Sequence, residues 1–295
     1  MFLTPFHGLC MALADSVPGV SGGTVAFILG FYDRFIDALH ALPGRDKAAR
    51  RAALGYLARL GAGWAVGMAA CILLLANLFA GHIYFMSSLF LGLTAASLPF
   101  VVQAERETLR GTWPQAVFAV LGCGVVVGLT LLRGTSGLSG VTMEGFRPLT
   151  LGYLFLCGAV AISAMVLPGI SGSSVLLIAG AYLPAVQAVR GLLGLDLRGL
   201  PGLMALGLGV LCGIACSVGL IRRALQRHRS QMVWLILGLM AGSLYSIVQG
   251  PASLAPPQAA MTTGTFSLAG FALGAAALLG LEGLRRVTER RASAC

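Results

Sequence analysis

The sequence predicts an all-α polytopic membrane protein made of two inverted repeats, each a re-entrant Pro-Gly-x-Ser-Gly helical hairpin followed by three transmembrane helices. Three observations support this fold class. Of the 295 residues, 57% are hydrophobic and 10% are charged, whereas soluble domains use roughly 25% charged residues. Several apolar runs have the length of a membrane span, and two apolar regions are interrupted by the same turn. The mean hydropathy of +0.89 agrees with a chain that lies mostly in a bilayer.

Six uninterrupted apolar runs are long enough to cross a hydrocarbon core of ~30 Å, which needs about 20 helical residues. They lie near residues 60–80, 83–103, 113–133, 200–221, 231–250 and 265–284. Glycines spaced four residues apart recur within these runs and predict helix faces that pack closely. The clearest pairs are Gly63 with Gly67, Gly238 with Gly242, and Gly270 with Gly274.

Two further regions, 2–39 and 149–189, are apolar but interrupted in the middle. About 15 residues precede the first interruption, and they would form roughly 22 Å of helix, too short to cross. We therefore expect region 2–39 to be a re-entrant hairpin that enters and leaves on one side. In the second region, "LTLGYLFLCGAVAISAMVL" (149–167) is nearly long enough to cross. For 149–189, a re-entrant form and a fully spanning form both stay open.

The two interrupted regions are copies of one another. Residues 17–32, "VPGVSGGTVAFILGFY", align without a gap with residues 167–182, "LPGISGSSVLLIAGAY", and half of the positions are identical. We therefore divide the chain into a first repeat, 1–148, and a second repeat, 149–295. Each repeat contains one hairpin and three spans. Because the number of spans is odd, the second repeat is expected to lie upside down relative to the first.

The basic residues support this inversion, because cytoplasmic loops of membrane proteins collect arginine and lysine. If the N-terminus is cytoplasmic, only four of the 20 basic residues face outward: Arg133, Arg147, Arg190 and Arg198. We therefore expect a multi-pass protein of the cytoplasmic (inner) membrane with both termini inside. Two full spans return the chain to the same side as a hairpin does, so the charges leave six and ten spans equally open.

The composition also indicates which partners to expect. The net charge is +10, but the basic residues lie between apolar runs and lack the aromatic interleaving of a nucleic-acid-binding surface. The bilayer is therefore the expected partner, and nucleic acid is not. The seven cysteines lie mostly inside apolar runs and the four histidines are scattered, so neither a metal site nor a cofactor is predicted. The sequence leaves assembly into a homo-oligomer open.

The two turns are the candidate functional site. Irregular backbone at membrane depth needs protein or a water-lined cavity around it, so we expect the turns to meet near the midplane. Their glycines let a ligand approach a helix start, where backbone N–H groups and the helix dipole favour an anion, most naturally phosphate. The alternative is that Pro-Gly-x-Ser only caps an ordinary helix. The predicted phosphate cradle comprises Gly19, Ser21, Gly22, Gly23, Thr24, Gly169, Ser171, Gly172, Ser173 and Ser174.

Charged chemistry is confined to the first copy, because Met165 stands where the first copy has Asp15. An ionisable residue inside a membrane is a functional candidate, and a buried aspartate can take up a proton. Asp15 is therefore the candidate for proton coupling, and capping of the following half-helix is its alternative role. Arg34 is a candidate accessory charge. It lies about ten residues past the cradle, roughly 15 Å along a helix, and is expected to mark the inner membrane surface. No catalytic residue is predicted.

Across nearly the whole chain the sequence resembles a bacterial membrane family once described only as a domain of unknown function. The family is now regarded as polyprenyl-phosphate (undecaprenyl-phosphate) translocases, and "DSVPGVSGGTVAFILGFYDR" and "PGISGSSVLLIAGAY" carry the resemblance. It implies a transporter, not an enzyme, that returns the lipid carrier undecaprenyl phosphate across the cytoplasmic membrane for cell-envelope synthesis. The residues alone indicate an anion site within a bilayer, which suits a phosphate headgroup whose isoprenoid tail stays in lipid.

Two other functions stay open. Membrane undecaprenyl-pyrophosphate phosphatases also have inverted repeats, with a Pro-Gly-x-Ser-Arg-Ser turn and two glutamates four residues apart. Here Gly22 and Gly172 stand at the arginine position, and Glu105 and Glu107 are two residues apart, so hydrolysis would lack the cation that stabilises charge on phosphorus. An anion channel could use the same opposed helix starts. Asp15 argues against a channel, because an ionised carboxylate repels anions.

Overall fold

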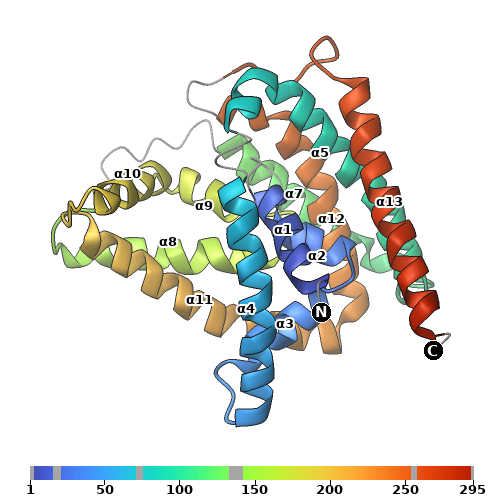
Figure 1. Ribbon diagram of the computed structural model, residues 1–295, viewed down its shortest axis with the longest axis horizontal. Coiled ribbons are helices and arrows are strands. Elements are labelled where there is room, and N and C mark those ends of the chain that lie inside the picture. Colours follow the sequence, from blue (N-terminus) through green and yellow to red (C-terminus); the bar gives the residue numbers. More distant parts are fainter. Residues whose placement is uncertain (1–2, 16–20, 71–75, 133–141, 254–257, 294–295) are drawn as a thin grey trace.

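The computed structural model describes residues 3–15, 21–70, 76–132, 142–253 and 258–293 (Figure 1). In these ranges the secondary structure is entirely helical, as the sequence predicts. Five helices are long and apolar enough to cross a membrane: His82–Ala104, Trp113–Leu132, Pro148–Val166, Leu200–Arg227 and Arg229–Val248. The protein is therefore a multi-pass helical membrane protein.

The first half of the chain forms three short helices and then longer ones. They are α1 (Leu3–Asp15), α2 (Gly22–Ile28), α3 (Tyr32–Ala41), α4 (Lys47–Ala70), α5 (Ala76–Ala104), α6 (Arg106–Leu109), the 3-10 helix η2 (Trp113–Ala116) and α7 (Val117–Leu132). The second half follows the same order. Its helices are α8 (Pro148–Val166), α9 (Gly172–Ile178), α10 (Tyr182–Leu193), α11 (Leu200–Arg227), α12 (Arg229–Val248), the 3-10 helix η3 (Gly250–Ser253) and α13 (Leu268–Ser293).

Four of the six expected spans coincide with helices of spanning length, and the other two differ. The run 60–80 is divided between α4 and α5, with residues 71–75 outside the described part of the chain. The run 265–284 begins α13, whose described apolar part, Leu268–Gly280, is shorter than a span. The two interrupted regions also differ in length, because α1 has 13 residues whereas α8 has 19 and could cross by itself.

The interrupted regions have matching backbones. Proline lacks an N–H group and ends a helix, and α8 stops just before Pro168, after which Gly169 adopts a φ of +92°. Helices α2 and α9 each have seven residues. They are followed by Gly30 and Gly180, whose φ values of +73° and +68° favour glycine. The next helix then begins at Tyr32 or Tyr182, so both regions turn at the same positions of the repeat.

Glycine faces hold the longer helices in pairs, which confirms the close packing expected from the sequence. Gly63 and Gly67 of α4 lie against Pro5 and Leu9 of α1. Because residue numbers rise together along both helices, the two helices are parallel. Three further pairs have the same arrangement: Gly209 and Gly213 of α11 on Phe155 and Ala159 of α8, Gly238 and Gly242 of α12 on Ala119 and Cys123 of α7, and Gly270 and Gly274 of α13 on Phe85 and Leu89 of α5.

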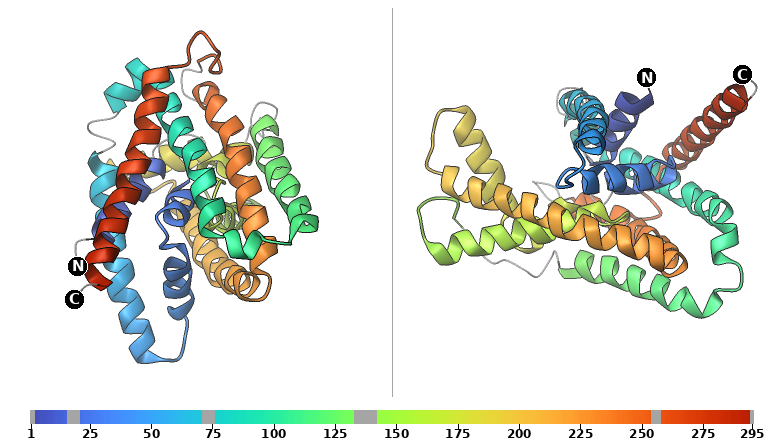
Figure 2. Two further views of the ribbon diagram at one scale, coloured as in Figure 1. Left: turned by 90° about the vertical axis from the view of Figure 1, so that its right-hand side faces the viewer. Right: turned by 90° about the horizontal axis from the view of Figure 1, so that it is seen from below.

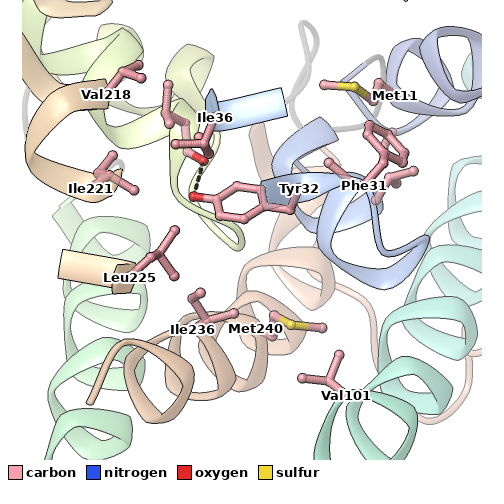
Figure 3. Packing of buried hydrophobic residues seen from close by; sticks show 14 of the residues in the cluster. Met11, Phe31, Tyr32, Ile36, Val101, Val218, Ile221, Leu225, Ile236 and Met240 are labelled. Atoms are coloured by element: carbon pink, nitrogen blue, oxygen red, sulfur yellow. Dashed lines mark hydrogen bonds between the residues drawn. The ribbon is translucent and has the colours of Figure 1, made fainter. Parts of the chain in front are cut away.

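The central core takes side chains from the first five helices, α1 to α5, and from α11 and α12. Figure 3 shows Tyr32 and Ile36 of α3 facing Val218, Ile221 and Leu225 of α11, with Ile236 and Met240 of α12 beneath them. Helices α8, α10 and α11 extend together to one side of this core (Figures 1 and 2). Burial of these large apolar side chains holds α3 in place. Because α3 directly follows α2, the same burial positions the last part of the first interrupted region.

Ion pairs gather at one end of the molecule. Arg222 of α11 pairs with Asp37 of α3 (Nε to Oδ1, 2.5 Å). Arg229, at the start of α12, pairs with Asp33 (3.3 Å) and with Glu105 (2.5 Å). Burial alone would raise the pKa of Glu105, but hydrogen bonds from Arg229 and Thr108, together with the charge of Arg229, hold that pKa below its ordinary value. Segments that the sequence assigns to the cytoplasmic side are therefore joined to one another.

Candidate functional site

Asp15 ends α1 and its carboxylate accepts two hydrogen bonds. The backbone N–H of Gly22 donates to Oδ1 at 2.7 Å, and the indole N–H of Trp64 in α4 donates to Oδ2 at 2.9 Å. A side chain added at Gly22 would strike this carboxylate in its present position, so glycine leaves room for the close approach. One of the donors predicted for the phosphate cradle is thus directed at a carboxylate of the chain itself.

Ser21 is the N-cap of α2, and its side chain is fully buried. Its hydroxyl oxygen accepts from the N–H of Gly23 at 3.2 Å, and its carbonyl oxygen accepts from the N–H of Thr24 at 2.9 Å. These contacts are those of an ordinary capped helix start, which is the alternative interpretation of the Pro-Gly-x-Ser turn. Gly19, the remaining member of the first predicted cradle, lies outside the described residues.

The second turn carries hydroxyl groups but no carboxylate at the equivalent position. A side chain added at Gly172 would meet Met165 and the carbonyl of Ala161. Met165 therefore contacts the start of α9 in the way that Asp15 contacts the start of α2. The hydroxyls of Ser171 and Ser173 are 2.7 Å apart and hydrogen-bonded. Ser174 lies in α9. Asp15 and Met165 therefore hold equivalent positions in the two copies and differ in charge.

The two turns touch, as the sequence predicts. The N–H of Gly169 donates to the side-chain oxygen of Thr24 at 2.7 Å, and Thr24 is only 3% exposed. One helix further on, the hydroxyl of Tyr32 donates to the carbonyl of Val166 at 3.0 Å (Figure 3). These two hydrogen bonds cross from the first half of the chain to the second. They gather the described cradle residues of both halves into one region.

Arg34 does not join this hydrogen-bonded group. It lies on the exposed side of α3, and its guanidinium sits over the ring of Tyr56 in α4, 4.6 Å from the ring centroid. This cation–π contact fastens α3 to α4. The side chains of Asp15 and Thr24 accept from backbone N–H groups and one indole N–H, and the carbonyls of Met165 and Val166 lie beside Gly23. The described residues contain no cluster of three metal-binding side chains.

Sequence reasoning missed Trp64 and Tyr32. Trp64 is 49 positions from Asp15, and only the packing of α1 on α4 brings the two together. A signal was nevertheless present, because Trp64 is flanked by the glycine face at Gly63 and Gly67 that contacts α1. Tyr32 is one of the positions that the two copies share, with Tyr182 as its counterpart. Such a shared polar residue next to a turn is a signal for a contact between the copies.

Comparisons with known proteins agree on one family. Residues 11–264 match a family described as undecaprenyl phosphate translocase-like. The chain is 31% identical over 243 residues to a polyprenyl-phosphate transporter of Staphylococcus aureus, which covers 82% of this chain and 84% of the relative. It is also 31% identical over 255 residues to a polyprenyl-phosphate transporter of Vibrio cholerae, covering 83% of this chain and 76% of the relative. No solved structure matches the chain.

Proposed function

The chain belongs to the undecaprenyl phosphate translocase-like family, and on that premise we propose that it carries undecaprenyl phosphate across the cytoplasmic membrane. The lipid carrier would return in this way for another round of cell-envelope synthesis. The relatives in Staphylococcus aureus and Vibrio cholerae are named polyprenyl-phosphate transporters. Transport of a polyprenyl phosphate, not its hydrolysis, is therefore the activity that we assign.

The observation that carries this proposal is the contact between the two turns. The hydrogen bond from Gly169 to Thr24 brings the donors of both copies into one region. In our proposal the phosphate headgroup binds there, and the isoprenoid tail stays in the bilayer. The headgroup takes hydrogen bonds from N–H groups at the two helix starts and from the hydroxyls of Ser21, Thr24, Ser171, Ser173 and Ser174. Gly19 and the other glycines of the turns let it approach the backbone.

Asp15 gives this site a means of coupling to protons. Its carboxylate accepts from the N–H of Gly22, which is one of the donors that we assign to the phosphate. A phosphate and an ionised carboxylate repel each other and compete for that donor, so binding is favoured when Asp15 is protonated. Release on the other side of the membrane would follow loss of the proton. Arg34 plays no part in this step, since its charge is held over Tyr56.

The architecture that we propose consists of two inverted repeats, 1–148 and 149–295. The parallel packing of α1 on α4 supports a re-entrant first hairpin. Because these helices run in one direction, the chain between them must return to the side from which α1 starts, and α1 is too short to cross. The parallel packing of α8 on α11 supports the same return in the second half. A half with an odd number of crossings inverts the half that follows.

We place both termini in the cytoplasm and the protein in the inner membrane. The basic residues lie mainly on one set of alternate loops. Ion pairs that join Asp33, Asp37, Glu105, Arg222 and Arg229 support a common side for these segments. At the other end, the hydroxyl of Tyr84 donates to the carbonyl of Ala259 at 3.1 Å, which supports a common side for the loops expected outside.

Reconstitution into vesicles tests the proposal directly. A fluorescent short-chain polyprenyl phosphate is placed in one leaflet, and both its transfer to the other leaflet and the release of free phosphate are measured. We expect transfer without phosphate release. Release of phosphate would mean a phosphatase, and passage of inorganic phosphate into the vesicles without lipid transfer would mean an anion channel.

A further inference from the structure

Helix α3 and its counterpart α10 are packed differently. Helix α3 lies along α11, with Ile36 fully buried among Val218 and Ile221 (Figure 3). In the described part of the chain, α10 packs against α9 and α11 but not along α4. Figures 1 and 2 agree that α10 stands away from α4. The third helix of the first half, α3, therefore packs along a helix of the second half, whereas its counterpart α10 does not pack along α4.

The closed contact of α3 has three layers, counted outward from the turns. Nearest to the turns, Tyr32 donates to the carbonyl of Val166. One helical turn further on, Ile36 is 1% exposed and packs against α11. At the rim, Asp37 pairs with Arg222. The buried side chain of Ile36 thus lies between Tyr32, at the start of α3, and the exposed ion pair of Asp37, whereas Asp33, one residue past Tyr32, is about half exposed.

A second guanidinium fastens the other edge of α3. Arg229 pairs with Asp33 of α3 at 3.3 Å and, through its other terminal nitrogen, with Glu105 at the end of α5. The Glu105 side chain is only 14% exposed, whereas those of Asp33 and Arg229 are about half exposed. Ion pairs that are open to water contribute little stability. The two more exposed pairs, Asp37–Arg222 and Asp33–Arg229, can therefore separate and re-form at low cost.

Among the described residues, the opposite end of the molecule has the ion pair Asp196–Arg198, but no ion pair at the positions that correspond to this rim. Helices α4 and α5 correspond to α11 and α12 at an offset of 146: Gly63 and Gly67 correspond to Gly209 and Gly213. The non-helical residues His82 (φ −136°, ψ 38°) and His228 (φ −132°, ψ 45°) also correspond. The first three helices of each half correspond at an offset of 150. At these offsets the counterparts are uncharged: Ala76 for Arg222, Ile83 for Arg229, Leu183 for Asp33 and Gln187 for Asp37.

We infer that Asp37–Arg222 and the Asp33–Arg229–Glu105 group form the ionic closure of the inner mouth of the phosphate site. The inference rests on the proposed function. The structure is then the state that is closed on the inner side, and α3 leaves α11 when the inner mouth opens. The charges set how readily α3 separates, and the buried Ile36 is the apolar part of the closure. The residues at the corresponding positions of the other half are uncharged.

Thiol labelling tests this closure without any need for transport. In a chain freed of its native cysteines, Ser171→Cys supplies a reporter at the second turn, and vesicles of both orientations receive a membrane-impermeant methanethiosulfonate. We expect Asp37→Arg and Arg222→Asp each to raise the inner-side labelling rate severalfold. The double variant restores the opposite charges and should return the rate to that of the parent. Unchanged inner-side rates in both single variants would overturn the inference.

The matched control is the exposed pair Asp196–Arg198, which lies before α11 at the other end of that helix. Asp196→Arg and Arg198→Asp should leave the inner-side rate unchanged. If a charge reversal prevents folding, the variant Asp37→Cys with Arg222→Cys serves instead. Its disulfide should lower the rate at which the reporter is labelled from the inner side, and reduction should restore that rate. An equal labelling rate with and without the disulfide would also overturn the closure. Failure of lipid transfer by the wild-type protein alongside a normal labelling result would reject the proposed function and leave the closure intact.

Discussion

The side-chain oxygen Oδ1 of Asp15 lies 2.7 Å from the backbone nitrogen of Gly22, seven residues further along the chain. The other carboxylate oxygen accepts from Trp64. In the second half, Met165 takes the place of Asp15 against Gly172. Equivalent positions of the two copies therefore differ in charge, and the Asp15 carboxylate occupies the N–H group of Gly22, which we assign to the phosphate headgroup.

Asp15→Asn separates capping from proton binding. The amide oxygen of asparagine can still accept from Gly22, but the amide NH2 group would face the indole N–H of Trp64, which loses its acceptor, so stability should fall by about 1–3 kcal/mol. We expect binding of polyprenyl phosphate to persist and transfer driven by a proton gradient to be lost. Both are measured on one purified variant, with Asp196→Asn on the exposed surface as the control. Gradient-driven transfer with an unaltered pH dependence would identify Asp15 as a cap only.

Gly22→Val and Gly172→Val test the close approach at the two turns. At Gly22 the new side chain strikes the Asp15 carboxylate, and at Gly172 it meets Met165 and the carbonyl of Ala161. Both variants should insert into the membrane and lose lipid transfer. Gly207→Val is the control, because nothing lies within 4 Å of the position of its added carbon. Full transfer by both turn variants would remove the turns from the binding site.

The inversion is tested by the side from which single cysteines react. In a cysteine-free chain, positions in 45–51 and 222–229 should be labelled only from the cytoplasm, and positions in 258–264 only from the periplasm. The physical reason is that arginine-rich loops stay on the cytoplasmic side. Single cysteines in soluble reporter domains fused at each terminus serve as orientation controls. Periplasmic labelling of 222–229 would reject the inverted arrangement.

Glu105→Gln should change how stability depends on pH. Burial raises the pKa of Glu105, but Arg229 and Thr108 lower it further than burial raises it. Because the folded pKa lies below the unfolded one, near 4.3, the ionised group stabilises the fold above that value. The stabilisation is lost as the pH falls through the folded pKa.

In detergent, the wild-type melting temperature should therefore fall more steeply than that of Glu105→Gln below about pH 5. The difference in stability at neutral pH should be roughly 1 kcal/mol or less, since Arg229 is half exposed. Glu107→Gln, at an exposed neighbouring position, is the control. If the melting temperatures of wild type and Glu105→Gln fall equally steeply at acid pH, the ion pair does not act in this way.

Much of the fold could be predicted because the two copies constrain each other. A gap-free shift of 150 predicted matching turns, and Gly30 and Gly180 have nearly equal φ values. The glycine faces were predicted from a spacing of four residues, which is one helical turn. The contact between the turns followed from the need to satisfy polar backbone at membrane depth, and the structure contains it as the hydrogen bond between Gly169 and Thr24.

The partners of the predicted donors could not be read from the sequence. Whether the N–H of Gly22 faces a ligand or Asp15 depends on how α1 packs on α4, and packing distances have no local signature. For the same reason Trp64 was missed. The different packing of α3 and α10 was also out of reach, because two copies with the same pattern predict the same contacts. Only the surrounding helices make the copies unequal.

The pairing of α5 with α13 and of α7 with α12 has a consequence for synthesis. Gly92 of α5 lies against Phe271, and Gly122 of α7 lies against Leu235, so the narrow grooves of the first half are filled by helices made last. Until the second half has been made, these two glycine faces lack the helices that cover them in the finished protein. A chain that ended after α7 would be inserted in the membrane yet unfinished, with its smallest residues facing the bilayer.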